Sequence, residues 1–314
     1  MEVLYSRCAG LDVHKDTVVA CVRVAVEGKV SREMRTFDTT TAGLVALSSW
    51  LAESGCTHVA MEATGVYWKP VWHILAADGF ALILANAAHV KNVPGRKTDI
   101  ADAAWLADLL AHGLIRASFV PEPALQEIRT LLRTRKQLGR EKTAHVQRLQ
   151  KTLEDANIKL DSVITDVIGV SGRAMIEALI AGESDPAALA RLAHRRLKAS
   201  PGKLSEALRG RVTPHHRFLL RLHLQQVDAV DTAIAQIDQE VEANLAPFRA
   251  AAQNLTAIPG VGALASRIIV SEIGIDMSRF PTAGPSSRGP VCAPAMMRAP
   301  ENGARPACAR ALRG

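Results

Sequence analysis

Residues 7–26, RCAGLDVHKDTVVACVRVAV, decide the fold of the N-terminal part of the chain. Two runs rich in β-branched and apolar residues, 7–13 and 17–26, flank the polar residues 14–16, which predicts two strands joined as a hairpin. Asp12 lies inside the first strand, among residues that otherwise favour burial. Because an unpaired buried carboxylate is costly, Asp12 needs a cation or a metal ion beside it.

The segments that follow residue 26 alternate between strand and helix patterns. Strands are predicted at 33–39, 58–63 and 81–85, and helices at 41–53, 66–77 and 99–112, with Thr41 as the N-cap of the first helix. The order β-β-β-α-β-α-β-α is typical of a mixed sheet with helices on its faces. Residues 1–118 are therefore predicted to form an α/β domain.

Further along the chain the apolar spacing changes to that of long helices. A seven-residue apolar register runs through 124–160, from Leu125 to Leu153, and a second seam lies within 220–241. Residues 119–249 are therefore predicted to form a helical arm in which two long helices pack as an antiparallel coiled coil. Ordinary core helices of a compact bundle would explain the same spacing.

The C-terminal part of the sequence divides into a helical segment and a tail. Residues 254–274 resemble a turn between two helices, and 250–283 are assigned to the start of a truncated helical C-terminal domain. Residues 284–314 form an aberrant tail. Within 281–314, six prolines and five arginines accompany one acidic residue and almost no periodic apolar pattern, which predicts disorder.

Composition excludes several classes of protein. The formal charge of +7 over 314 residues is modest, and the 4% aromatic content argues against a stacking platform for single-stranded nucleic acid. No uncharged apolar run approaches the ~18 residues of a membrane span. The five cysteines form no CxxC pair and the N-terminus has no export signal, so a reduced, cytoplasmic protein is expected.

Further carboxylates stand where metal chemistry needs them. Glu62 sits in a short apolar strand, and Asp99 and Asp102 share one face of a helix start, ~5–6 Å apart. With Asp12 they supply the oxygen ligands that two Mg²⁺ ions ~3.5–4 Å apart require for phosphodiester chemistry. Simpler roles remain open, such as a turn former for Asp12, a helix cap for Asp99 and a first-turn acid for Asp102. Asp108, later on the same helix, is expected to be solvated.

Motifs in the same order carry a resemblance to a known family. GLDVHKDT (10–17), MEATGVYW (61–68), KTDIADAAWLADLL (97–110) and IPGVGALASRIIVSEIG (258–274) resemble successive motifs of the DEDD-type insertion-sequence transposases of the IS110 family. The N-terminal domain of that family is similar to the RuvC Holliday-junction resolvase. The resemblance covers residues 6 to about 283. It implies an RNase H-like fold, a catalytic and metal-binding tetrad on Asp12, Glu62, Asp99 and Asp102, and Mg²⁺ or Mn²⁺ as cofactor.

The same resemblance implies a function. It predicts a transposase or recombinase that acts on the DNA ends of an element and on target DNA, guided by an RNA that the element encodes. Paired arms point to a homo-oligomer, either a dimer or a tetramer. Two alternatives stay open: a nucleic-acid-binding remnant without catalysis, and a RuvC-like junction resolvase, which needs only the tetrad.

Basic residues are segregated along the helical region. Residues 127–151 hold eight Lys or Arg against two acids, and 191–221 hold nine against one, whereas 227–242 hold five acids and no basic residue. This pattern favours phosphate binding along the arm. A solvated helix face balanced by an acidic helix would give the same counts. The predicted contacts on the first stretch are Arg133, Lys136 and Arg140.

Two loops are further candidates for contact with nucleic acid. The loop before the third predicted acid carries Lys91, Arg96 and Lys97, placed to hold a backbone beside the metal ions. Gly260 and Gly262 belong to a PGVG turn that resembles a helix-hairpin-helix, where glycines let the chain approach a phosphate and helix N–H groups bind it. Plain surface loops would explain both segments equally.

The chain departs from the family pattern after Gly284. The family continues with a Trp-Ala-Gly-Leu-Cys-Pro-like stretch and then a serine that is taken as the nucleophile joining protein to DNA. Neither Ser286 nor Ser287 has that context. Met296-Met297, encoded ATGATG, gives an Asp codon when read one nucleotide earlier, which indicates a frameshift after Gly284. We therefore expect that this copy does not complete strand exchange.

Overall fold

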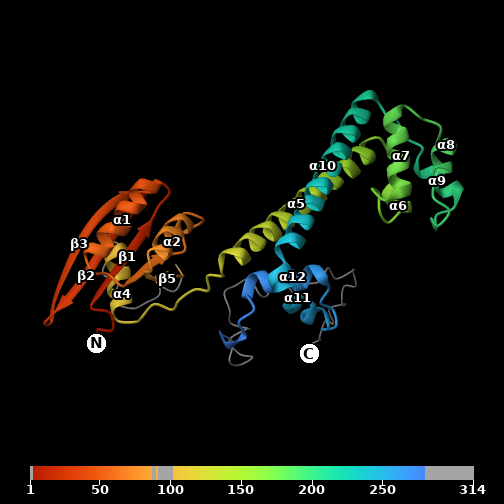
Figure 1. Ribbon diagram of the computed structural model, residues 1–314. Coiled ribbons are helices and arrows are strands. Elements are labelled where there is room, and N and C mark those ends of the chain that lie inside the picture. The colour runs from red at the N-terminus through yellow and green to blue at the C-terminus, as the bar shows by residue number, and fades with distance from the viewer. Residues whose placement is uncertain (1–2, 87–89, 91–101, 280–314) are drawn as a thin grey trace, which may run out of the picture. The chain divides into compact units, whose positions relative to one another are not determined.

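The computed structural model describes residues 3–86, 90 and 102–279 (Figure 1). The chain folds into two compact units, Met1–Val120 and Pro121–Gly314. The first unit is built on a sheet and the second is mainly helical.

The first unit contains a mixed five-stranded sheet in the order β3-β2-β1-β4-β5. β1, β2 and β3 form an antiparallel meander, while β4 and β5 run parallel to β1. The predicted mixed sheet and its first hairpin are therefore confirmed. The strands are β1 (Arg7–Val13), β2 (Thr17–Val26), β3 (Lys29–Asp38), β4 (His58–Glu62) and β5 (Ala81–Ala85).

Several bounds differ from the prediction. The helix predicted at 66–77 begins at Trp68 and the strand predicted at 58–63 ends at Glu62, and one further strand and one helix cap differ as well. β3 begins at Lys29 rather than at residue 33, after a tight turn in which Glu27 and Gly28 both have positive φ. β3 is exposed along nearly its whole length, so no alternating apolar pattern marks its start. The N-cap of α1 (Thr41–Glu53) is Thr40 rather than Thr41, because the Thr40 side chain accepts a hydrogen bond from the backbone N–H of Gly43 at 3.2 Å.

Helices cover both faces of this sheet. α1 (Thr41–Glu53) and α2 (Trp68–Ala77) bury one face in a core that includes Leu11, Leu47 and Met61. α4 (Asp102–Ala111) covers the other face with a row of alanines. Since side chains alternate along a strand, the even-numbered residues of β1 and β4 face α4, as Cys8 and Ala60 do.

Gly10 sets how closely α4 approaches the sheet. A Cβ at Gly10 would lie 2.2 Å from the carbonyl oxygen of Ala103 and 2.5 Å from the backbone nitrogen of Ala107. No side chain fits between β1 and the helix backbone at this point. The close contact fixes α4 against the centre of the sheet.

Asp108 also fixes α4, which overturns the expectation that this residue is solvated. Its carboxylate accepts hydrogen bonds from Arg23 Nε at 2.9 Å and from Arg32 Nη2 at 2.8 Å. Arg23 is only 3% exposed. The two arginines come from β2 and β3, so the sequence of α4 alone gives no sign of the contact.

The cysteines of this unit are unpaired thiols. Cys8, Cys21 and Cys56 are free and buried. Burial raises the pKa of the Cys8 thiol to about 12 and that of Cys56 to about 11, and it also raises the pKa of Cys21. All three are therefore protonated and unreactive at neutral pH. Cys292 and Cys308 lie outside the described residues.

The second unit is organised by a long antiparallel helix pair, α5 (Pro123–Asp155) and α10 (Pro214–Asn244), which Figure 1 shows side by side. Residues that rise in number along α5 meet residues that fall along α10: Arg135 contacts Asp238, and Lys142 contacts Asp231. The antiparallel packing agrees with the prediction. Coiled-coil geometry remains a prediction. α5 stops five residues before the predicted end, and Asn157 has a positive φ of 56° that breaks the helix.

A separate hydrophobic core forms at each end of the helix pair. At the end where α5 finishes, Leu149 and Leu220 pack with the short helices α6 (Leu160–Val163), α7 (Val170–Ala181), α8 (Pro186–Arg191) and α9 (Pro201–Ala207). At the other end, Leu125 and Val241 pack with α11 (Arg249–Thr256) and α12 (Ala263–Ile273). Across the described part of the chain, no helix combines the length and apolarity needed to span a membrane.

Candidate metal site and nucleic-acid surfaces

Asp12 and Glu62 lie at the carboxyl ends of two neighbouring parallel strands. β1 pairs with β4 so that Gly10 is opposite Ala60 and Leu11 is opposite Met61. Continued by one residue, this register sets Asp12 beside Glu62, with the strands ~4.8 Å apart. Both residues have even numbers, so both occupy the face of the sheet that α4 covers.

Asp102 begins α4 at the same edge. The Cys8 thiol donates a hydrogen bond to the carbonyl of Ala107 at 3.5 Å, while the carbonyl of Ala103 lies over Gly10. α4 therefore runs antiparallel to β1, and its N-terminus lies toward the carboxyl end of that strand. Asp102 is brought to the edge that carries Asp12 and Glu62. A negative charge there is also favoured by the helix dipole.

The donor set suits a hard divalent cation, although a complete site is not formed by these residues alone. Within residues 3–86, 90 and 102–279, no group of three or more His, Cys, Asp or Glu side chains has the geometry to hold a metal ion. Asp12 is hydrogen-bonded to His14 Nε2 at 3.1 Å and keeps a quarter of its side chain exposed. The carboxylates are oxygen ligands of the kind that Mg²⁺ and Mn²⁺ prefer. Asp99, the remaining member of the predicted tetrad, lies outside the described residues.

The basic loop predicted beside the tetrad also lies outside the described residues. This applies to Lys91, Arg96 and Lys97. Their contact with a nucleic-acid backbone stays a prediction.

Four of the eight basic residues on α5 have partners in the protein. Arg135 and Lys142 form ion pairs with Asp238 and Asp231 of α10, at 2.6 and 2.7 Å. The other two, Arg129 and Arg133, bind the C-terminal turn of α12. Arg129 donates to the carbonyl oxygens of Ser271 and Glu272, and Arg133 donates two hydrogen bonds to the Glu272 carboxylate. Arg133, predicted to hold phosphate, is thus already paired.

The other predicted contacts on α5 differ from Arg133. Lys136 and Arg140 are exposed, and they form no hydrogen bond or ion pair with any described residue. They are four residues apart, so they share one face of the helix. That face lies away from Lys142 and α10. Two of the three predicted contacts therefore remain available to a ligand.

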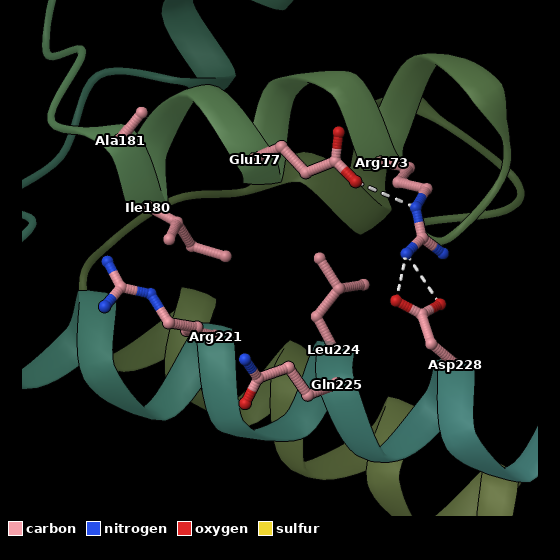
Figure 2. A pocket seen from close by; sticks show the side chains of 8 residues that line it. All are labelled: Arg173, Glu177, Ile180, Ala181, Arg221, Leu224, Gln225 and Asp228. Atoms are coloured by element: carbon pink, nitrogen blue, oxygen red, sulfur yellow. Dashed lines mark hydrogen bonds and ion pairs between the residues drawn. The ribbon is translucent and has the colours of Figure 1, made fainter.

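A groove between α7 and α10 shows the same contrast at close range (Figure 2). At one end, Arg173 is held by hydrogen bonds to both oxygens of Asp228 and by one to Glu177 at 2.9 Å. These carboxylates raise the pKa of Arg173 still further. At the other end, Arg221 is exposed and has no such partner among the described residues. The groove, of about 350 Å³, thus has a neutralised end and a cationic end.

The predicted PGVG turn joins two helices, as expected. Gly260 has a φ of +87°, which favours glycine, and Gly262 precedes the first turn of α12 without a side-chain cap. Both glycines are exposed. The helix start can therefore meet a phosphate, but the arrangement equally serves as a simple turn between α11 and α12.

Sequence reasoning missed the contacts that neutralise charge. For α5 the sequence did contain a signal: the acidic stretch 227–242 of α10 could be recognised as a partner for the basic stretch 127–151. The Arg23–Asp108 contact had no comparable signal, because a buried arginine in a strand and an acid in a distant helix look independent until the fold joins them.

Comparison with known proteins gives a family for part of the chain. The family model of the DEDD transposases of IS110 elements, described as a transposase, matches residues 9–158. The match spans the sheet, α4 and the whole of α5, and it contains all four predicted acids. The resemblance predicted from the motifs is confirmed over this range. No curated protein matches the chain.

Proposed function

Residues 9–158 form a DEDD transposase domain of the IS110 family, and from this premise we propose that the chain cleaves and transfers DNA strands at a two-metal site. Asp12, Glu62, Asp99 and Asp102 are its proposed ligands. The observation that supports the proposal is the parallel register of β1 and β4, which sets Asp12 beside Glu62, together with the direction of α4, whose first residue is Asp102 and whose N-terminus lies toward the carboxyl end of β1. The family implies DNA as the substrate.

The chain's own residues have distinct roles in this proposal. The two strands hold Asp12 and Glu62 at a fixed separation because the sheet register does not slip. α4 presents Asp102 from above, held in place by the close contact at Gly10. When bound, Mg²⁺ or Mn²⁺ polarises a phosphate and stabilises the attacking and leaving oxygens. Lys136 and Arg140 bind the DNA backbone through their charge.

Binding of Mg²⁺ by the full chain tests the metal site. Metal that binds only the folded state raises stability, by about 2.7 kcal/mol at a hundredfold excess over Kd. We expect thermal unfolding of the wild type to shift upward with Mg²⁺, and Asp12→Asn and Glu62→Gln to lose that shift while remaining folded. Asp16→Asn, an exposed acid in the same hairpin, is the matched control and should respond like the wild type. A wild type that ignores the metal would refute the proposal.

We also propose the DNA substrates, the RNA and the oligomeric state that the reaction requires. We assign the DNA substrates as the element ends and a target, with a guide RNA and a homo-oligomer, a dimer or tetramer, completing the complex. A junction resolvase would instead cleave a four-way junction and leave element ends uncut, and a non-catalytic remnant would bind DNA and cut neither. Parallel cleavage assays on both substrates, with Asp12→Asn as the inactive control, separate these functions.

The family resemblance also implies a serine nucleophile that joins the protein to DNA. The tail that would carry it, 284–314, lies outside the described residues. On its sequence we propose that the metal site is retained and that no protein–DNA adduct accumulates, because the nucleophile is missing. The test is incubation with element ends, Mg²⁺ and any guide RNA, followed by a denaturing gel. An adduct lost on mutation of Ser286 or Ser287 would contradict this, and one obtained only after the frame is restored past Gly284 would support it.

A further inference from the structure

The segment 186–211, which comprises α8, α9 and their flanking loops, is here called the α8–α9 lobe. It carries seven basic residues and one acid, Glu206, for a formal charge of +6. Three of its leucines point inward: Leu189, Leu204 and Leu208 are buried in the core at that end of the helix pair. The basic residues between them are consequently left on the surface. They are Arg191, Arg195, Arg196, Lys198, Lys203, Arg209 and Arg211, all exposed.

Almost none of this charge is neutralised by the described residues. Arg191 lies 4.0 Å from Asp185, and Arg209 lies 3.9 Å from Glu206, and all four side chains are more than half exposed. Exposed pairs at such distances contribute little. The side chains of the other five basic residues have no ion pair or hydrogen bond with the described residues. The lobe therefore differs from α5, where half of the basic residues are paired.

The acids nearest to the lobe in sequence are committed to the backbone. Asp185 caps α8 by accepting hydrogen bonds from the N–H groups of Ala187 and Ala188. Glu183 accepts from the N–H groups of Ser184 and Asp185. These carboxylates hold the entry of the lobe in shape, and Asp185 also forms the long contact with Arg191.

The lobe is also anchored to the helices around it. The backbone N–H of His194 donates to Ser171 Oγ of α7 at 2.9 Å, and the N–H of Arg211 donates to the carbonyl of Ala156 at 2.8 Å. Between α8 and α9 lies an open groove of about 550 Å³ lined by Arg191, His194, Arg195 and Leu197 among others. Two of the cations, Arg191 and Arg195, are thus carried on a preformed concave surface.

We infer that the α8–α9 lobe binds the phosphate backbone of duplex DNA. Exposed Lys and Arg with few carboxylate partners attract a polyanion and release its counterions. The lobe has no Phe, Tyr or Trp on which single-stranded bases would stack, which favours a duplex. DNA rather than RNA follows from the proposed function, on which this part of the inference rests. The lobe lies beyond the residues that match the transposase family.

Binding of a fluorescein-labelled 25-base-pair DNA duplex of arbitrary sequence, measured by anisotropy between 50 and 200 mM KCl with EDTA present, tests the inference. The variant replaces Arg195, Arg196 and Lys198 with Gln. We expect at least a tenfold rise in Kd and a fall of about 2.7 in the slope of log K against log salt, from about 0.9 per lost phosphate contact. The charge-reversed single variant Arg196→Glu should weaken binding in the same direction.

The matched control removes the same charge elsewhere, through Lys29→Gln, Lys69→Gln and Arg116→Gln together. All three residues belong to the first unit, whereas the lobe belongs to the second. This control should change Kd by less than threefold. Equal weakening by both triple variants, or unchanged binding by the lobe variant, would overturn the inference. So would loss of binding to an RNA duplex of the same sequence with DNA binding intact.

Because the DNA-binding assay contains EDTA, its result is independent of the Mg²⁺ test of the proposed function. In EDTA the wild type should still bind the duplex, since phosphate binding by the lobe needs no divalent cation. If Mg²⁺ does not stabilise the wild type but the lobe variant loses DNA binding, the inference about the lobe stands and the two-metal site is refuted. If Mg²⁺ stabilises the wild type but the lobe variant binds DNA normally, the two-metal site stands and the inference about the lobe is refuted.

Discussion

α5 and the α8–α9 lobe have similar charge in the sequence and different charge in the fold. Residues 127–151 hold eight basic residues against two acids, and 186–211 hold seven against one. On α5, ion pairs with α10 and hydrogen bonds to α12 occupy Arg129, Arg133, Arg135 and Lys142. In the lobe, the ion pairs are limited to two long, exposed contacts among the described residues.

A count of basic residues along a chain therefore does not give the number of cations that remain free to bind a ligand after folding. A cation that already has a carboxylate partner gains less from a phosphate, since it must exchange one anion for another. The acids of α10 lie where α5 passes, whereas the described acidic partners of the lobe's cations are Asp185 and Glu206, both at long distance. Available charge is therefore set by which helices pack together.

The largest expected effect comes from the most buried contact of this kind, Asp108 with Arg23. We expect Asp108→Ala to lower the free energy of unfolding by about 3 kcal/mol, because it leaves a buried arginine unpaired. The exposed contact of α5 provides the contrast, and Asp238→Ala should cost under about 1 kcal/mol. All four tryptophans, Trp50, Trp68, Trp72 and Trp105, lie in the first unit, so urea unfolding followed by their fluorescence measures the effect of Asp108→Ala. Far-ultraviolet circular dichroism during urea unfolding measures the effect of Asp238→Ala in the helical second unit. Equal costs for the two variants would remove the distinction between buried and exposed pairs.

The next effect concerns the two classes of cation on α5. Replacing Lys136 and Arg140 with Gln should reduce the salt slope of duplex DNA binding by about 1.8, roughly equally across sequences. Arg133→Gln should change the slope little, because Arg133 is held by Glu272. Anisotropy titrations in KCl measure both. A sequence-restricted loss would mean that Lys136 and Arg140 read bases, and a full contribution from Arg133 would mean that its ion pair opens on binding.

A smaller effect is expected from the ion pair between α5 and α10. A double-mutant cycle with Arg135→Gln and Asp238→Asn should give a coupling energy of about 0.5–1 kcal/mol, since both side chains are partly exposed. Far-ultraviolet circular dichroism during urea unfolding follows the helical unit. A cycle with Lys198 and Asp185 serves as the reference and should give no coupling.

The smallest effect is a pH dependence at the His145–His223 contact, whose Nδ1 atoms lie 3.3 Å apart between α5 and α10. Burial, followed by the charges of His145 and Arg148, lowers the pKa of His223 below its ordinary 6.5. The unfolded chain then takes up this proton before the folded chain does. Stability is therefore constant above about pH 7 and falls as the pH drops through 6.5. His223→Gln should flatten this part of a melting-temperature profile between pH 7.5 and 5, and an unchanged profile would contradict the assignment.

Much of the first unit was predictable because its elements have strong local patterns. Residues 7–13, 17–26 and 81–85 are strands with the predicted bounds, and 41–53 is a helix with the predicted bounds. Apolar periodicity and turn residues carried this information. β3 was located only in part, since a strand exposed on both faces has no alternation to reveal its start.

The candidate site was predictable in its residues and not in its geometry. An acid inside an apolar strand is visible in the sequence, which is why Asp12 and Glu62 could be chosen. That they are neighbours follows from the parallel register of β1 and β4, which pairs residues fifty positions apart. Asp102 joins them because Gly10 lets α4 run directly over β1.

The sequence by itself determined the element types, the mixed sheet, the succession of a sheet unit by a helical unit and the family motifs, because each depends on local spacing and residue type. Only the tertiary structure decided which charged side chains form ion pairs: Asp108 with Arg23 and Arg32, Arg133 with Glu272, and Lys142 with Asp231. Ion pairing acts over a few ångströms in space and is indifferent to separation along the chain, so it becomes defined only when distant segments meet.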